Sequence, residues 1–236
     1  MASQKKKNTP SPSVPVKIAV IAVSVLLIAA VVVGIVFLIG SLKEPEKGPI
    51  DLTKAYTKKL EAVDHVTNYI QIELDCGAYI VAELYPDIAP ITVANIQKLV
   101  SEKFYDNIIF HRVIKDFMIQ AGDPTGTGSS GSGETIVGEF SANGIDNPLS
   151  HTRGVLSMAR RSGDNDSASS QFFIVHKDYP SLDGSYAAFG KVIRGMETVD
   201  AIAEAETGTV EVNGISVKDH PLTDIKIKTI SFVEIG

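Results

Sequence analysis

Residues 110–123 read FHRVIKDFMIQAGD, and this segment carries more information about the protein than any other. Side chains alternate between the two faces of a β-strand, so Arg112 points to the face opposite its chain neighbours. A turn at residues 115–116 then starts a second strand, which carries apolar side chains and Gln120. The pattern predicts a guanidinium and an amide at the rim of an apolar patch. Such a site can hold an apolar ring and hydrogen-bond the amide beside it.

Three further segments accompany the first one in a fixed order. Residues 154–159 read GVLSMA, residues 170–174 read SQFFI, and residues 182–192 read LDGSYAAFGKV. Together with residues 110–123 they resemble the landmarks of the cyclophilin family of peptidyl-prolyl cis/trans isomerases, at roughly that family's spacing. The resemblance covers residues 69–233, which is a whole cyclophilin-sized domain.

The fold class that follows is mainly β. The pattern of residues 67–84 predicts a hairpin, and Pro90 predicts the first turn of a helix, where its missing N–H costs nothing. A second helix is expected over residues 195–203, and a last strand within residues 223–234. Many short strands favour a closed barrel, because closure removes exposed strand edges. The resemblance implies a closed eight-stranded antiparallel barrel that is capped by two α-helices.

The resemblance also implies the site and its chemistry, which is rotation about X–Pro bonds. It assigns catalysis to Arg112, Phe117 and Gln120, with Arg112 as the donor to the twisted amide and Gln120 holding Arg112 and the substrate backbone. The proline ring is expected to sit on Phe117, Met118, Phe173 and Leu182. The remaining substrate-binding residues are His111, Ala159, Arg160, Gln171 and Tyr186, with Ala159, Arg160 and Gln171 in a neighbouring groove and His111 supporting the site without transferring protons. No bond breaks in this reaction, so we expect no cofactor and no metal.

Two positions depart from the best-known family members. The chain has no Trp, and Ser181 stands where a pocket tryptophan is common. Tyr186 stands at a position that is often His, and its hydroxyl can still bond substrate. We therefore expect catalysis with weak binding of cyclosporin.

Several of these residues have other interpretations. Phe110 and Phe172 are expected in the core, and residues 126–131, which match G-x-G-x-x-G, in a flexible loop beside the groove. A hydrolase that uses His111 and Asp116 is rejected, because no nucleophile-elbow pattern accompanies them. His151 is expected to be structural. The serious alternative is a cyclophilin-like domain that binds client proteins with little turnover.

The amino-terminal part predicts a membrane anchor. Residues 18–40 contain no charge, and at about 1.5 Å per residue they are long enough to span a bilayer as a helix. Residues 1–17 form a basic tail, which favours a cytoplasmic amino terminus. Residues 41–64 are expected to be a linker with a short helix, and residues 65–236 the isomerase domain. The chain is thus expected to be a single-pass protein of the cell membrane, with its catalytic domain on the extracytoplasmic side.

Charge and cysteine content limit the partners. The chain carries 22 basic and 28 acidic residues, and six of its lysines lie in residues 1–47. The domain that follows is therefore acidic, which argues against nucleic acid, since phosphate contacts by Lys and Arg dominate that affinity. Cys76 is the single cysteine, so no intramolecular disulfide forms. The expected partners are client polypeptides that contain proline, namely exported or surface proteins.

Overall fold

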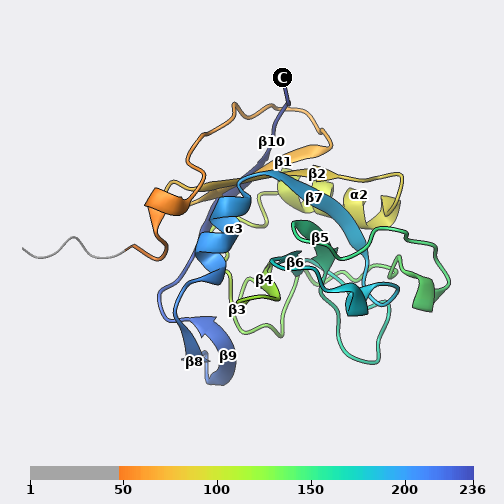
Figure 1. The fold of residues 1–236 in the computed structure, drawn as a ribbon. Coiled ribbons are helices and arrows are strands. Elements are labelled where there is room, and N and C mark those ends of the chain that lie inside the picture. Colours follow the sequence, from red (N-terminus) through yellow and green to blue (C-terminus); the bar gives the residue numbers. More distant parts are fainter. Residues whose placement is uncertain (1–47) are drawn as a thin grey trace, which may run out of the picture. The chain divides into compact units, whose positions relative to one another are not determined.

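The structure, a computed structural model, describes residues 48–236 (Figure 1). The large sheet contains β1 (Tyr69–Leu74), β2 (Tyr79–Leu84), β3 (Arg112–Ile114), β4 (Met118–Ala121), β5 (Val155–Met158), β6 (Phe172–Val175), β7 (Ala188–Arg194) and β10 (Ile227–Phe232). A second sheet contains β8 (Thr207–Val212) and β9 (Ile215–Pro221). The helices are α2 (Pro90–Ser101), α3 (Met196–Ala203) and the short 3-10 turns η1 (Leu52–Lys54), η2 (Ser141–Asn143) and η3 (Pro180–Leu182).

The eight strands of the large sheet are paired in the order β10-β1-β2-β7-β5-β6-β4-β3, and every pair is antiparallel. The sheet curls strongly, and its inner face packs aliphatic side chains such as Ile72, Ile80 and Leu156 into one core. These side chains are at most 1% exposed. Burial of this apolar surface is the dominant force that holds the sheet in its curled form.

The expectation of a closed barrel was wrong, because β10 and β3 form no ladder with each other. A single bridge between Ile109 and Lys226 spans the seam, together with backbone hydrogen bonds such as Phe110 N to Ile225 O (2.9 Å). Asn107 has a positive φ of 65°, so the chain turns just before β3 and meets β10 for only a few residues. The sheet is therefore a half-barrel with an irregular seam.

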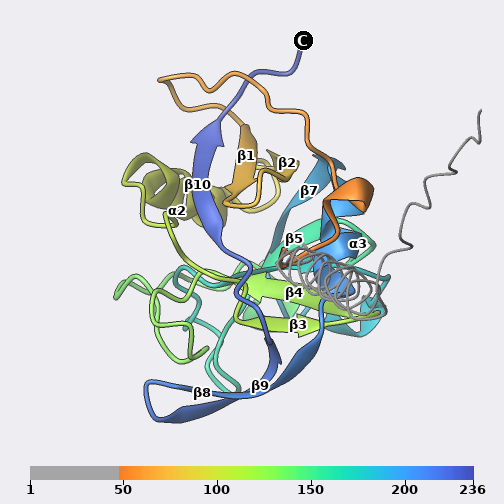
Figure 2. The ribbon, with the colours of Figure 1, turned by 90° about the vertical axis from the view of Figure 1, so that its left-hand side faces the viewer.

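The local predictions for the hairpin, the helices and the last strand are confirmed. β1 and β2 pair across a turn in which Gly77 has a φ of +88°. Pro90 is the first residue of α2, which buries Val93 and Ile96 against the core. The helices α2 and α3 lie on opposite sides of the curled sheet (Figure 2).

The segment that was expected to be a linker contacts the domain over its described part. Ile50 is buried in the core, and the Leu60 N–H donates to Oε1 of Gln71 at 2.7 Å. The Val63 N–H donates to the carbonyl of Phe232 at 2.9 Å. Its expected short helix is a single 3-10 turn, η1. The described part of this segment is thus held on the domain by hydrogen bonds to β1, β2, β10 and α3.

The predicted membrane anchor, residues 18–40, and the basic tail before it lie outside the described residues. Within residues 48–236, no helix has the length and apolar character that crossing a bilayer requires.

Candidate active site

The β3–β4 hairpin brings Arg112 and Gln120 together. They are directly opposite each other in the ladder, and Ile114 faces Met118 two residues further along. The turn lies at the predicted place, with Asp116 at a φ of 62°. Opposite residues in an antiparallel pair share one face of the sheet, so the guanidinium and the amide project together. On the other side of β4, Gln120 pairs with Phe173 of β6.

The two strands form the floor of a pocket of about 380 Å³. Ten of the eleven predicted site residues line it, namely His111, Arg112, Phe117, Met118, Gln120, Ala159, Arg160, Phe173, Leu182 and Tyr186. The remaining one, Gln171, lines an adjacent hollow with Gln120, Ala159 and Arg160. The structure therefore brings together residues that lie more than 70 positions apart in the chain.

The apolar part of this pocket is separate from the main core. A small cluster is built on Met118 and Phe173, and Phe117 and Leu182 pack against it. Met118 and Phe173 are 1% and 5% exposed, so the seat for an apolar ring is backed by packed side chains. Phe110 and Phe172 lie in the main core, as expected.

A chain of amides fixes the groove side of the pocket. Gln120 Nε2 donates to Oε1 of Gln171 at 2.8 Å, and Gln171 Nε2 donates to the carbonyls of Gly128 and Ser130. Gln120 Nε2 is engaged by Gln171, and the prediction that Gln120 holds Arg112 stays a prediction. Asp219 lies close to Arg112 as well, with its Oδ2 3.7 Å from Nε of the guanidinium.

The loop with the G-x-G-x-x-G pattern does border the groove, and it is tied to Asp123. The Ser130 N–H donates to Oδ2 of Asp123 at 3.1 Å, and Thr125 donates to Oδ1 with both its N–H and its hydroxyl. Burial acts to raise the pKa of Asp123, but these hydrogen bonds outweigh it and lower the pKa. The carboxylate thus stays ionised and orders the loop that receives Gln171.

Arg160 forms the opposite wall of the groove. Its Nε donates to the carbonyl of Ser185 at 2.9 Å, and its guanidinium lies over the rings of Phe140 and Tyr186, with centroid distances of 5.3 and 4.9 Å. Arginine stacks well on aromatic faces because its guanidinium is planar and weakly hydrated. The side chain is therefore held in place for contact with a peptide.

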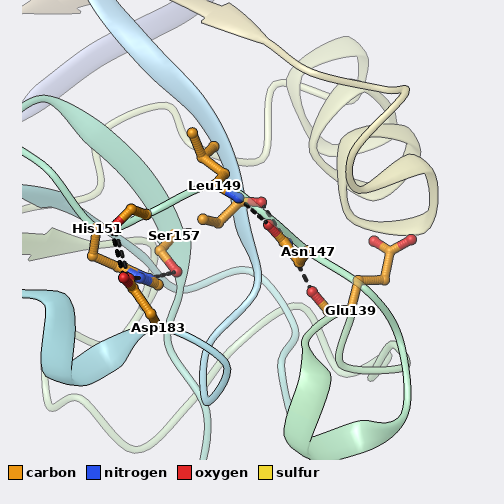
Figure 3. Close-up of polar contacts among 8 residues, drawn as sticks. Glu139, Asn147, Leu149, His151, Ser157 and Asp183 are labelled. Carbon is orange, nitrogen blue, oxygen red and sulfur yellow. Dashed lines mark hydrogen bonds and ion pairs between the residues drawn. The ribbon is translucent and has the colours of Figure 1, made fainter.

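A polar cluster around the buried His151 supports the pocket (Figure 3). His151 Nδ1 lies 2.8 Å from Oδ1 of Asp183, and Nε2 lies 2.9 Å from Oγ of Ser157. The imidazole also stacks on Phe173, with a centroid distance of 6.1 Å. Asp183 directly follows Leu182, so this cluster fixes the segment that carries one wall of the apolar seat. His151 is structural, as expected.

The Ser157, His151 and Asp183 side chains are arranged like a hydrolase triad, yet they cannot act as one. Ser157 is fully buried, so its hydroxyl cannot reach a substrate. The same figure shows Asn147, which donates to the carbonyls of Glu139 and Ala188 and accepts from the Leu149 N–H. These bonds tie the segment before His151 to Glu139 and to β7.

His111 lies under the pocket and is only 1% exposed. Burial lowers its pKa to about 4, and the nearby charge of Arg112 and the ring of His220 act in the same direction against the raising effect of Asp123. The imidazole is therefore neutral at neutral pH, which suits a supporting role and not proton transfer.

The comparison with known families decides the identity. The model described as "Cyclophilin type peptidyl-prolyl cis-trans isomerase/CLD" matches residues 69–232. The chain belongs to the cyclophilin family. Its activity class is that of a peptidyl-prolyl cis-trans isomerase.

Named relatives agree with this assignment. "Peptidyl-prolyl cis-trans isomerase B" of Bacillus subtilis is 49% identical over 124 residues, which cover 52% of this chain and 82% of that protein. "Peptidyl-prolyl cis-trans isomerase-like 1" of Gibberella zeae is 42% identical over 170 residues, which cover 72% and 97%. A cyclophilin of Cryptosporidium parvum, whose crystal structure was solved in the presence of the dipeptide Ala-Pro, matches with a TM-score of 0.61 and 32% identity, covering 71% of this chain and 99% of that one.

Sequence reasoning missed one part of the cyclophilin pocket. Ser216, Val217 and Lys218 of β9 also line it, and Asp219 reaches Arg112. The adjacent Asn213 and Gly214 are a strong hairpin signal, which could have revealed β8 and β9 but not their position at the pocket.

Proposed function

We propose that this cyclophilin accelerates rotation about X–Pro bonds by using Arg112 as a donor to the twisted amide. The supporting observation is that Arg112 lines the same pocket as Phe117, Met118 and Phe173, which form its apolar floor. A proline ring seated on that floor presents its imide nitrogen to the rim. The Ala-Pro dipeptide named for the Cryptosporidium parvum relative is a ligand of the chemistry that such a seat accepts.

The energetics favour such a donor. Rotation about a peptide bond meets a barrier of about 18–20 kcal/mol, because resonance gives the C–N bond partial double-bond character. In the twisted state the nitrogen regains a lone pair, and a guanidinium N–H aimed at it stabilises that state over both ground states. Arginine is charged at any ordinary pH, so this donor needs no titration.

An Arg112→Lys variant tests the role of the planar guanidinium group. Lysine keeps the positive charge but loses the directed pair of N–H groups, so the account expects a rate reduced at least about ten-fold with an X–Pro peptide. Lys115→Ala, an exposed charge change on the same hairpin, is the matched control and keeps the wild-type rate. A lysine variant as fast as the wild type would show that charge alone suffices.

We further propose that the clients are exported or surface polypeptides and that residues 18–40 anchor the chain in the cell membrane. Their uncharged composition and the basic residues ahead of them support this proposal. Membrane fractionation of the full chain, followed by protease treatment of intact cells, tests it. Recovery in the soluble fraction, or protection of the domain until the cells are lysed, would contradict it.

The alternative, a client-binding cyclophilin with little turnover, is separated by comparing peptide affinity with the isomerisation rate. Micromolar peptide binding without any acceleration would favour it. The presence of Arg112, Phe117 and Gln120 around one pocket favours catalysis.

A further inference from the structure

The β8–β9 hairpin is part of the active site. Figure 2 shows it below β3, and β9 contacts that strand directly. Val217 is 7% exposed, which anchors the hairpin on the domain, while Ser216 and Lys218 on either side of it line the pocket. A substrate in the pocket therefore touches the hairpin as well as the large sheet.

A β-bulge sets the geometry of this contact. Gly208 pairs with His220 and Val210 with Val217, so β9 holds one residue more than β8 over this interval. Asp219 lies in the bulge with a φ of +56°, a left-handed conformation that few residues other than glycine and Asn or Asp adopt readily. Bulges of this kind redirect a side chain, and here the carboxylate of Asp219 lies 3.7 Å from Nε of Arg112.

Lys218 lies in the same bulge and differs from the other cations of the pocket in its contacts. Of the three cationic side chains that line it, Arg112 faces Asp219, and Arg160 bonds the Ser185 carbonyl and stacks on two rings. The Lys218 side chain forms no ion pair and no hydrogen bond with any other residue of the described range 48–236. Its ammonium is exposed, so it is available to a group that the substrate brings.

The position of Lys218 indicates which part of a peptide it meets. The pocket and the adjacent hollow share Gln120, Gly128, Ala159 and Arg160, whereas the hairpin residues line the pocket alone. A peptide that passes through the hollow and places its proline in the pocket can leave the pocket along the hairpin, since the hairpin residues line the pocket but not the hollow. The first residue beyond the proline on that side then lies within the field of Lys218.

We propose that Lys218 binds a carboxylate on the peptide residue next to the proline, so that this cyclophilin prefers substrates with an acidic flanking residue. The inference rests on the proposed isomerase function, since it assigns a subsite to the same pocket. Asp219 has an accessory role, because its carboxylate lies 3.7 Å from Nε of Arg112 and so connects the bulge with that side of the pocket.

The test compares matched peptides with the full chain. Amidated peptides carry Glu, Gln or Lys directly before or directly after the proline, and exchange NMR gives kcat/KM for each. The small free energy of an exposed ion pair predicts a preference of about two- to five-fold for Glu over Gln at one of the two positions. The preference falls as salt is raised, because exposed charges are screened.

Variants assign the preference to its residue. Lys218→Met abolishes the Glu-over-Gln ratio, and Lys218→Glu reverses it in favour of the Lys peptide. Lys58→Met, which removes another exposed lysine that does not line the pocket, keeps the wild-type ratio. A Gln peptide with a free carboxyl terminus shows whether a main-chain carboxylate is bound as well.

Equal rates for Glu and Gln peptides at both positions would overturn the inference while leaving the isomerase function intact. A preference that survives in Lys218→Met would overturn it too. If the wild type accelerates no peptide, the proposed function fails instead. The dissociation constants of the same peptides, measured by NMR titration, then test Lys218 on their own, and equal values for Glu and Gln would again overturn the subsite.

Discussion

Burial of His111 makes the stability of this cyclophilin sensitive to pH below neutrality. The folded protein lowers the pKa of this histidine to about 4, from an ordinary value of 6.5. Between these values the unfolded chain binds a proton that the folded chain does not, so the free energy of unfolding falls as the pH falls below 6.5. Above 6.5 both states are neutral, and the full contribution is present.

The magnitude follows from the two pKa values. Each pH unit within the window changes the free energy of unfolding by about 1.4 kcal/mol, which gives a loss of about 2 kcal/mol by pH 5 and about 3 kcal/mol by pH 4. Asp123 and Glu73 have lowered pKa values and lose their contributions only at lower pH. Between pH 7 and pH 5, the change in the free energy of unfolding therefore comes from the histidines.

Urea unfolding of the full chain between pH 7 and pH 5 measures this effect. All seven tyrosines lie in residues 48–236, so tyrosine fluorescence reports on the domain. His111→Gln removes about 2 kcal/mol of the pH-dependent loss, whatever its effect on stability at pH 7. His65→Gln, at a side chain that is 57% exposed, is the control and retains the wild-type dependence. Parallel curves for wild type and His111→Gln would refute the reasoning.

Two further predictions concern the segment beside the proline seat. Asp183→Ala removes the acceptor of the Ser150 hydroxyl and of the His151 ring, so we expect a loss of about 1–3 kcal/mol in the free energy of unfolding and a higher KM, measured by urea unfolding and peptide kinetics. Unchanged stability would show that the cluster is not structural. Ser181→Trp adds a large apolar surface next to Leu182, and we expect cyclosporin to inhibit this variant at least about ten-fold more strongly than the wild type. Equal inhibition would show that Ser181 does not determine the affinity for cyclosporin.

Local patterns allowed much of the fold to be predicted. The alternation in residues 67–84, the Pro at the start of α2 and the turn between Arg112 and Gln120 depend on neighbours in sequence, and all three were predicted correctly. The closed barrel was predicted wrongly. Closure depends on whether residues 107–110 and the start of β10, which are far apart in the sequence, pair along a continuous ladder. The turn at Asn107 ends that contact after a few hydrogen bonds.

In the active site, too, some features were predicted from the sequence and the contacts between distant segments were not. The resemblance named eleven residues, and the structure gathers ten of them in one pocket and the eleventh beside it. The partners of these residues were beyond sequence reasoning, since the pairing of Gln120 with Gln171 and of Arg112 with Asp219 joins segments that are 51 or more positions apart. The bulge at Asp219 is equally hidden, because nothing local in residues 215–221 requires it.

The central claim, that Arg112 acts on the twisted amide, is tested most directly with Arg112→Ala. Exchange NMR on one X–Pro peptide gives the interconversion rate and the affinity together, and urea unfolding gives the stability. The account predicts a rate at least about 100-fold lower, with affinity within a few-fold and stability within about 1 kcal/mol of the wild type, since the side chain is 40% exposed. An unchanged rate, or losses of rate and stability in equal proportion, would contradict it.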